Sequence, residues 1–293
     1  MKLVITGASG QLARRVAELV LATAPPEDVI LATRTPELLA PLAARGVTVR
    51  RADFEDAATL RAAFAGGERL LLVSATDLSR RTAQHEAALH AAKAAGVRHV
   101  IYTSGLKPAP PNPAVVAPSH HATEQALARS GLQWTVLRNS LYADYQLPEA
   151  RHALETGVLA HNRGRGTVAY VAREDCAAAA AAVLLQPGHA GAVYEITGGE
   201  SYSADDLAAL YAELGGRPVR AQALDDAELI ALMVGDATGD DHLRYGAELV
   251  TSFGRSIREG FMDSRTDAVE QLTKRAPATL RQVLAPLAAS CSR

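Results

Sequence analysis

The sequence predicts an α/β fold in which a doubly wound parallel sheet precedes a smaller C-terminal region. In the first half of the chain, short apolar runs alternate with stretches of helical spacing, which is the pattern of βαβ units. A glycine-rich turn directly follows the first apolar run. The composition, with 48% hydrophobic and 21% charged residues among 293, is that of an ordinary globular protein with a sizeable core.

Six strands are expected in the first half, at Leu3–Ile5, Val29–Ala32, Val47–Val49, Leu70–Val73, His99–Tyr102 and Thr135–Leu137. Helices are expected between them, at 11–23, 36–44, 57–65, 81–95 and 119–130. Crossovers between parallel strands are right-handed, so these helices should cover both faces of the sheet. The expected fold class is therefore α/β, a Rossmann doubly wound parallel sheet.

Prolines gather after the fifth strand, between Pro108 and Pro118. They interrupt helical continuity, so we expect an extended loop at the carboxyl edge of the sheet. Loops at that edge commonly border ligands, although a plain surface connection fits the same residues.

The regularity weakens in the second half of the chain. There we expect a helix near 148–156, a turn at Gly164–Gly166, a helix at 173–186 and a strand at Ala192–Ile196. Ser203 to Asp206 reads as the start of another helix. We predict a nucleotide-binding Rossmann domain at 1–138 and a mixed α/β, substrate-covering region at 139–293 that partly returns to the main sheet.

Charge and cysteine content exclude several classes of function. A formal net charge of -2 gives no sign of nucleic acid or an anionic membrane as a partner. The two cysteines, Cys176 and Cys291, suggest neither a disulfide framework nor a zinc cluster. The apolar run at Lys2–Ile5 is too short for a signal peptide, which predicts a cytoplasmic protein. A homodimer is compatible with the sequence, which does not specify the oligomeric state.

The segment from Thr6 to Ala13 lies where a dinucleotide-binding fingerprint belongs, between a strand and a helix. Gly7 can make the tight turn and Gly10 can let the backbone approach a pyrophosphate, whose charge the free amides of a helix start favour. Ala13 replaces a third glycine, a tolerated change at a packing position. We therefore expect the pyrophosphate at Gly7, Ala8, Ser9, Gly10, Gln11 and Leu12.

The end of the second strand indicates which dinucleotide is bound. Arg34 stands where an NAD enzyme has an acidic residue for the ribose hydroxyls, and a guanidinium can pair with the 2′-phosphate of NADPH. After the third strand, Asp53 could accept from the adenine amino group while Phe54 packs nearby, although a helix-capping Asp is an equal alternative.

Small residues end the fourth and fifth strands, at Ser74, Ala75 and Thr76 and at Thr103–Ser104. They leave room for the ribose and nicotinamide, but their hydroxyls could equally cap turns. No tyrosine has a lysine four residues later, so the acid of short-chain dehydrogenases that reduce ketones is missing.

His120 and His121, with Glu124, resemble a metal or acid–base cluster. Adjacent helical histidines point in different directions and a third ligand is not evident, so no metal is expected. For His120 two interpretations stay open: a residue that faces the substrate, or a residue of the helix surface.

Taken together, the chain resembles the NmrA-like branch of the atypical short-chain dehydrogenases over nearly its whole length. The resemblance rests on the fingerprint, Arg34, 70–74, Gln84–His85, 91–97, 102–104, Leu137–Asn139 and Tyr142. It departs at Ala13, at His121 and over 235–265, where little similarity can be placed. It implies an NADPH enzyme with Arg138 near the cofactor and with Asn139 and Tyr142 beside the nicotinamide as catalytic candidates.

Three functions are compatible with these residues. The first is hydride transfer from NADPH to a quinone or a similar flat acceptor, which needs little acid catalysis because the developing phenolate is a weak base. The second is a non-catalytic NADP(H) sensor, a class that the same family contains. The third is an isomerase or reductase of another small aromatic substrate.

Overall fold

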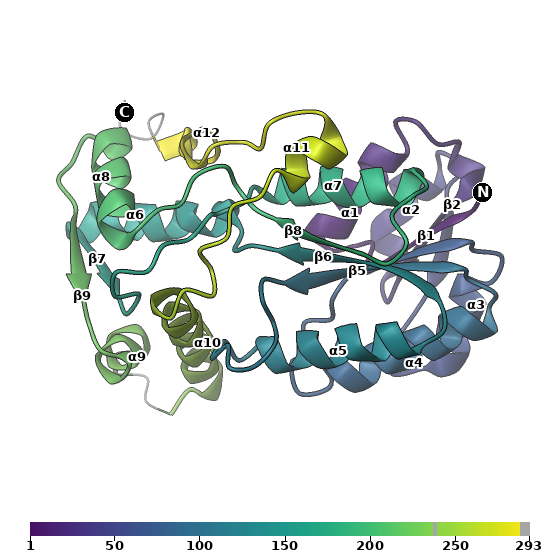
Figure 1. Ribbon diagram of the computed structural model, residues 1–293, viewed down its shortest axis with the longest axis horizontal. Coiled ribbons are helices and arrows are strands. Elements are labelled where there is room, and N and C mark those ends of the chain that lie inside the picture. Colours follow the sequence, from purple (N-terminus) through teal and green to yellow (C-terminus); the bar gives the residue numbers. More distant parts are fainter. Residues whose placement is uncertain (237–238, 288–293) are drawn as a thin grey trace.

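The computed structural model describes residues 1–236 and 239–287 and contains a sheet of seven parallel strands (Figure 1). The strand order is β3-β2-β1-β4-β5-β6-β8, so the chain winds outward in both directions from β1. The strands are β1 (Leu3–Thr6), β2 (Val29–Thr33), β3 (Thr48–Arg51), β4 (Arg69–Leu72), β5 (His99–Gly105), β6 (Gln133–Asn139) and β8 (Ala192–Ile196). The predicted doubly wound Rossmann sheet is confirmed.

Helices cover both faces of this sheet (Figure 1). One face carries α1 (Gln11–Val20), α7 (Arg173–Leu185) and α11 (Ala268–Thr273), and the other carries α3 (Ala57–Phe64), α4 (Arg81–Ala94) and α5 (Ala117–Arg129). The edge helix α2 (Ala40–Ala43) and three short 3-10 turns, at Pro26–Asp28, Pro36–Leu39 and Ala143–Tyr145, complete the connections.

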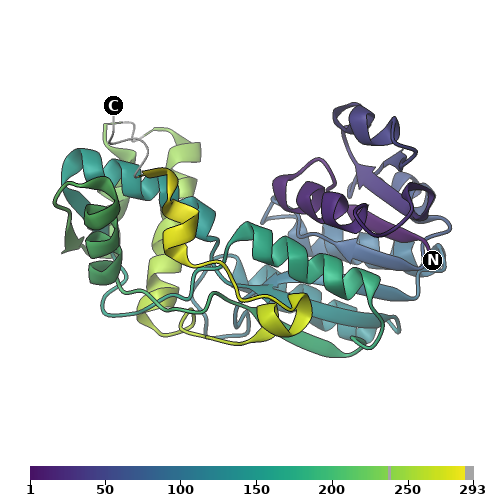
Figure 2. The same cartoon turned by 90° about the horizontal axis from the view of Figure 1, so that it is seen from above.

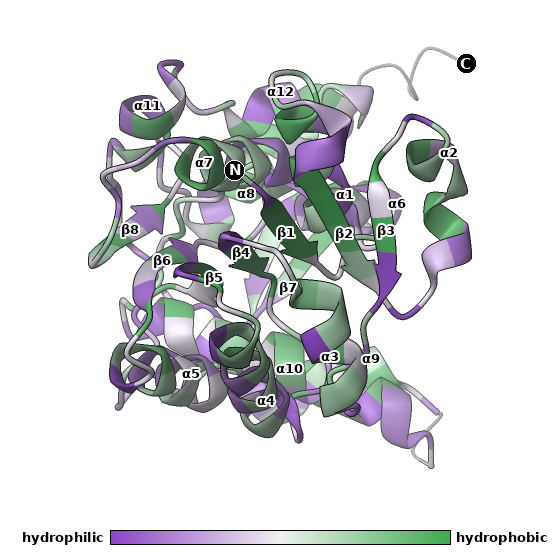
Figure 3. Ribbon diagram, turned by 90° about the vertical axis from the view of Figure 1, so that its right-hand side faces the viewer, coloured by the Kyte–Doolittle hydropathy of each residue, from purple (hydrophilic) through white to green (hydrophobic). Residues whose placement is uncertain are grey.

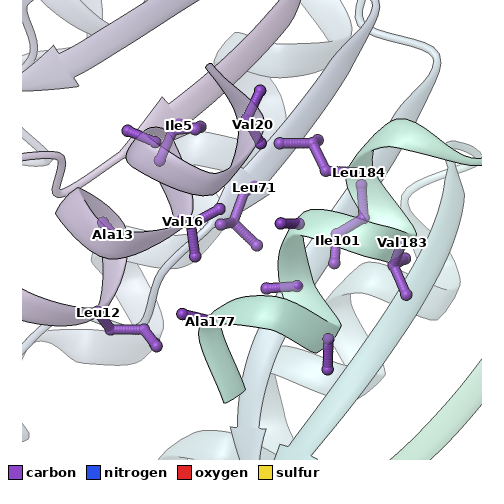
Figure 4. Packing of buried hydrophobic residues seen from close by; sticks show 14 of the residues in the cluster. Ile5, Leu12, Ala13, Val16, Val20, Leu71, Ile101, Ala177, Val183 and Leu184 are labelled. Carbon is purple, nitrogen blue, oxygen red and sulfur yellow. The ribbon is translucent and has the colours of Figure 1, made fainter. Parts of the chain in front are cut away.

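Each face has its own apolar core. Leu12, Val16 and Val20 of α1 recur at helical spacing and are buried against Leu71, Ile101 and the alanine-rich α7 (Figure 4). Small side chains on α7 let this helix lie close to the sheet and to α1. The central strands β1 and β2 are the most hydrophobic part of the fold, whereas β3 at the edge is partly hydrophilic (Figure 3), as expected for strands buried on both faces.

The second half of the chain contributes to two places. Helix α7 and strand β8 return to the main sheet, where β8 pairs with β6. The remaining elements form a lobe beyond the carboxyl ends of the strands (Figures 1 and 2). They are α6 (Gln146–Thr156), β7 (Val158–His161), α8 (Ala204–Gly215), β9 (Arg220–Ala223), α9 (Asp226–Val234), α10 (Asp241–Arg258) and α12 (Leu280–Leu284).

Several predicted elements differ from the structure. The single helix expected at 36–44 is a 3-10 turn followed by α2, because Pro41 has no N–H to continue the helical ladder. Pro118 lies inside the first turn of α5 rather than in the loop before it, a position where a missing N–H costs nothing. The small parallel pair β7–β9 was not anticipated, since four-residue strands carry little periodic signal.

Other expectations hold. Helix α8 begins directly after the predicted Ser203, which caps it: the Ser203 hydroxyl accepts from the Asp206 amide, and the Asp206 carboxylate accepts from the Ser203 amide. Cys176 is buried in α7, and Cys291 lies outside the described residues. Among the residues that the structure describes, no helix is both long and apolar enough to cross a membrane.

Candidate active site

The loop after β1 is shaped by Gly7, whose φ of 61° lies in the left-handed region that glycine adopts without strain. The Gly10 amide donates to the Gly7 carbonyl at 2.8 Å, and the Ala8 amide donates to the Ala32 carbonyl of β2 at 3.2 Å. Ala8 and Leu12 point into the core, whereas Gly7, Gly10 and Gln11 are exposed. At Gly7 and Gly10 the loop therefore presents bare backbone to solvent.

Helix α1 starts at this loop, and no side chain among the described residues caps its N-terminus. The first amides of a helix lack intrahelical partners and carry partial positive charge. A pyrophosphate group placed here would accept from these amides, so the loop fits the group that the fingerprint predicts.

A cluster of three hydroxyls joins this loop to the end of β2. The Ser9 and Thr33 hydroxyls share a hydrogen bond at 2.9 Å, and the Thr35 hydroxyl lies 3.3 Å from both. Arg34 stands between the two threonines in sequence, is exposed, and forms no hydrogen bond or ion pair with any described residue. A free guanidinium beside hydroxyl donors is a suitable environment for a phosphate monoester.

Asp53 and Phe54 follow β3, as predicted, but Asp53 does not cap the next helix. Its Oδ1 accepts from the Glu55 amide at 3.1 Å, while Asp56 caps α3 by accepting from the amides of Ala58 and Thr59. Phe54 is half-buried and meets His85 edge-on, with ring centroids 6.2 Å apart.

The segment after β4 is clamped by two side chains of α4. The Ala75 amide donates to His85 Nε2 at 2.9 Å, and Arg81 Nε donates to the Ala75 carbonyl at 2.7 Å. The Ser74 amide donates to the Thr103 hydroxyl of β5 at 3.0 Å. Both sides of the Ala75 peptide are therefore fixed, and Ser74 and Thr76 line a cavity.

This cavity has a volume of about 1700 Å³ and opens at the carboxyl ends of β4, β5 and β6. Its walls are mainly apolar beyond the sheet edge, where α9 and α10 contribute Leu232, Tyr245, Leu249, Phe253 and Ile257. The proline-rich loop also lines it, through Pro108, Asn112 and Ala114. That loop is therefore more than a surface connection.

Asn139 and Tyr142 both line the cavity, and the structure brings them into contact. Asn139 Nδ2 donates to the Tyr142 hydroxyl at 3.2 Å, while Asn139 Oδ1 is buried and finds no partner in the described part of the chain. The Tyr142 ring stacks on Tyr145 and lies 5.4 Å below the Arg173 guanidinium. Burial raises the pKa of Tyr142 above its usual value, so its phenol stays protonated at neutral pH.

Arg138 lies next to Asn139 but does not line the cavity. Its Nε and Nη2 donate to the two carboxylate oxygens of Glu124 at 3.0 and 2.6 Å, and Glu124 Oε1 also accepts from the Ser104 hydroxyl at 2.7 Å. This bidentate pair anchors α5 to the ends of β5 and β6. Arg138 is therefore placed to support the site from outside the cavity.

His120 and His121 point in different directions, as expected for neighbours on a helix. His121 is partly exposed and pairs with Gln125, whereas His120 is 8% exposed and lines the cavity. The helix-surface interpretation of His120 is therefore wrong. No group of three or more metal-binding side chains occurs within residues 1–236 and 239–287.

The hydrogen-bond partners of His120 define its tautomer. Arg81 Nη1 lies 3.3 Å from His120 Nε2 and can only donate, so Nε2 accepts and the proton sits on Nδ1, 2.7 Å from the Tyr102 hydroxyl. Burial lowers the pKa of His120 to about 3, with the nearby Arg81 charge acting in the same direction. The imidazole is therefore neutral at physiological pH.

Comparisons with known proteins agree with this arrangement. A family model described as NAD(P)H-binding matches residues 7–187. The chain is 42% identical to quinone oxidoreductase 2 of Escherichia coli over 229 residues, covering 78% of this chain and 80% of that protein.

Solved structures give the same picture. The crystal structure of the E. coli NADPH-dependent quinone oxidoreductase in complex with NADPH matches with a TM-score of 0.92 at 35% identity, over 97% of this chain and 99% of that one. Triphenylmethane reductase of Citrobacter sp. in complex with NADP(H) matches with a TM-score of 0.89 at 30% identity, over 98% and 100%.

Proposed function

Since this chain belongs to the NAD(P)H-binding family, we propose that it transfers hydride from NADPH to a quinone or a similar flat acceptor held in the cavity. It is an NAD(P)H-dependent oxidoreductase of the Rossmann type, with NADPH as cofactor. The observation that carries the choice of acceptor is the position of the cavity. It starts at the strand ends where a nicotinamide belongs and continues between apolar walls.

In this proposal the cofactor lies along the carboxyl edge of the sheet. The backbone from Gly7 to Leu12 holds the pyrophosphate, and Arg34 with the Thr33 and Thr35 hydroxyls holds the 2′-phosphate. Asp53 and Phe54 border the adenine. The clamped segment Ser74–Thr76 forms the wall beside the nicotinamide, and Arg138 supports the ends of β5 and β6 through Glu124.

When bound, NADPH supplies the hydride, and the side chains at the strand ends position the acceptor. Asn139 and Tyr142 are the proposed catalytic pair. The phenol of Tyr142, which is protonated at neutral pH, can donate to an acceptor oxygen while Asn139 orients that phenol. The apolar walls exclude water and accommodate a flat ring. A quinone suits this site because its reduced oxygen needs no strong acid.

The alternative of a non-catalytic NADP(H) sensor is not favoured, because the similar proteins named above are a quinone oxidoreductase and a triphenylmethane reductase. The cytoplasmic location, the homodimer and the boundary at residue 138 stay predictions.

A steady-state screen tests the proposal. Purified protein and NADPH are mixed with benzoquinones, naphthoquinones and triphenylmethane dyes, and the loss of nicotinamide absorbance is followed. We expect turnover with at least one quinone and a marked preference for NADPH over NADH. Tight NADPH binding with no turnover of any flat acceptor would support the sensor instead.

A further inference from the structure

Arg81 is a buried cation in the wall of the cavity, and no carboxylate of the described residues contacts it. Its side chain belongs to the first turn of α4 and the residue is 7% exposed. Nε donates to the Ala75 carbonyl, and Nη1 faces His120 Nε2 at 3.3 Å and the Ser119 hydroxyl at 3.4 Å. All three partners are neutral, so the charge of the guanidinium is not compensated by them.

A buried charge of this kind is costly unless something pairs with it. Arg163, which also lines the cavity, has a carboxylate partner, because its Nη2 donates to both oxygens of Glu149. The nearest acid on the segment before α4 is Asp77, which is engaged by Arg80 and Ser79 at the exposed turn. Arg81 therefore keeps a positive charge at the cavity wall that lacks a carboxylate partner in the described chain.

One nitrogen of Arg81 is still available. Nη2 donates to no described atom, while the other two nitrogens hold the guanidinium in place. The guanidinium is held rigidly, because Ala75 is itself clamped by His85 and because His120 is held by Tyr102. The guanidinium is thus oriented in advance, beside Ser74 and Thr76, where the proposed nicotinamide wall meets the acceptor space.

We propose that Arg81 is the anion-recognition residue of the acceptor site, binding through Nη2 the acceptor oxygen that becomes negatively charged on reduction. The inference rests on the proposed function and deepens it. It assigns as substrates flat rings that end the hydride transfer as oxyanions, above all quinones, and not acceptors whose product is uncharged at that position.

The charges of the reaction fit this assignment. A quinone gains one hydride, which is two electrons and one proton, from NADPH, leaving NADP⁺ and a hydroquinone that carries one negative charge on an oxygen. That oxygen then takes one proton from water. Arg81 binds the oxygen more strongly once it is charged, so the interaction is stronger after hydride transfer than before, which is the requirement for lowering the barrier.

The most direct test uses 4-nitrophenol, a flat phenol whose ionised form is coloured and which is not an oxidant of NADPH in this reaction. Wild-type protein with saturating NADP⁺ is titrated with the probe across a pH series, and the absorbance gives the ionisation midpoint of the bound phenol. The apolar walls alone would raise that midpoint relative to water, whereas a facing guanidinium lowers it. We expect a lowering that corresponds to at least about tenfold tighter binding of the phenolate than of the phenol.

Variants at Arg81 separate charge from packing. Arg81→Gln can still donate to Ala75 but carries no charge, so the ionisation midpoint of the bound 4-nitrophenol should rise above its value in water. Arg81→Lys keeps the charge and should retain part of the lowering. Arg80→Gln is the matched control, because Arg80 is the neighbouring residue, does not line the cavity and pairs with Asp77 and Glu55 on the surface. NADP⁺ affinity and the urea midpoint of each variant report on folding.

The inference is overturned if wild-type protein fails to bind the probe, if it raises the midpoint, or if Arg81→Gln matches wild type. It is also overturned if Arg81→Gln weakens the binding of NADP⁺ but not that of the phenol, which would assign Arg81 to the cofactor. If Arg81→Gln does not fold, two results still test the inference: the sign of the midpoint shift in wild-type protein and the retained lowering in Arg81→Lys. Phenolate binding without quinone turnover would remove the proposed function and keep the anion site. Full quinone turnover by Arg81→Gln would remove the anion site and keep the proposed function.

Discussion

The two ends of the site are built in different ways. The cofactor end comes from two short segments, Gly7–Leu12 and Thr33–Thr35, that adjoin because β1 and β2 are paired. The acceptor end is a buried cavity assembled from the ends of three strands, the proline-rich loop and helices as distant in sequence as α4 and α10. A short motif can therefore specify the cofactor, while the acceptor depends on the whole fold.

The largest expected effect separates the cofactor end from everything else. Gly10→Val places a branched side chain where the backbone should approach the pyrophosphate, and its Cβ would lie 3.1 Å from the Gly7 carbonyl oxygen. Binding of both NADPH and NADH should fall below detection in a fluorescence titration, with the fold retained. Gly239→Val, in open space at an exposed turn, is the control. Retained affinity in Gly10→Val would reduce the fingerprint to a structural turn.

The next effect divides the two cofactors. Arg34→Glu replaces a free cation by a negative charge that repels the 2′-phosphate. The affinity for NADPH should therefore fall by at least about 10- to 100-fold, the equivalent of one charge-assisted hydrogen bond. The affinity for NADH should change little. Arg217→Glu makes the same charge change on an exposed residue between α8 and β9 in the distant lobe. Dissociation constants for both cofactors check this, and equal loss for both would contradict the assignment.

A smaller effect distinguishes catalysis from binding at the acceptor end. Asn139→Ala and Tyr142→Phe should each slow quinone reduction by about 10-fold, less than the loss of an oxyanion-hole donor, because a quinone oxyanion is delocalised. NADPH affinity should be nearly unchanged. Asn139 is buried and Tyr142 is half-buried, so melting temperatures must be measured in parallel. Lower stability with unchanged activity of the folded fraction would make the pair structural.

The smallest effect concerns stability in acid. Burial lowers the pKa of both His85 and His120 to about 3, well below the value near 6.5 that is expected in the unfolded chain. Between these values the unfolded chain binds more protons, so stability should fall as the pH drops through this window, by up to about 1.4 kcal/mol per pH unit for each histidine.

His120→Gln should therefore lose less stability than wild type between pH 7 and pH 5 when urea midpoints are compared. His121→Gln, which removes the neighbouring and more exposed imidazole, should keep the wild-type acid sensitivity. An unchanged slope in His120→Gln would show that His120 does not stay neutral in the folded protein.

The sequence could predict the cofactor end of the site better than the acceptor end. The sheet and the glycine loop were predictable because apolar runs and turn residues act locally. Arg81 was not, because an arginine at a helix start ordinarily faces solvent, and only the packing of α5 against α4 buries it beside His120. The burial of His120 depends likewise on Tyr102 of β5, whose hydroxyl lies 2.7 Å from His120 Nδ1, a contact that no local pattern in the sequence indicates.

The apolar walls supplied by α9 and α10 were also missed. The segment 235–265, which contains α10, shows little similarity to the family. Exposed side chains such as Leu232 of α9 and Tyr245 of α10 have no periodic pattern that marks a cavity. The sequence could therefore predict where the cofactor is held but not what shape of acceptor fits.

The central claim is that hydride passes from NADPH to the acceptor inside this cavity, and isotope substitution tests it most directly. NADPH carrying deuterium at one or the other C4 position is mixed with enzyme and a quinone in a single turnover, so that product release does not limit the rate. A nicotinamide held against the clamped Ser74–Thr76 wall exposes one face, so only one of the two labels should slow the reaction. Equal rates for both labels would contradict the account, because the transferred hydrogen would then not come from a nicotinamide oriented by this site.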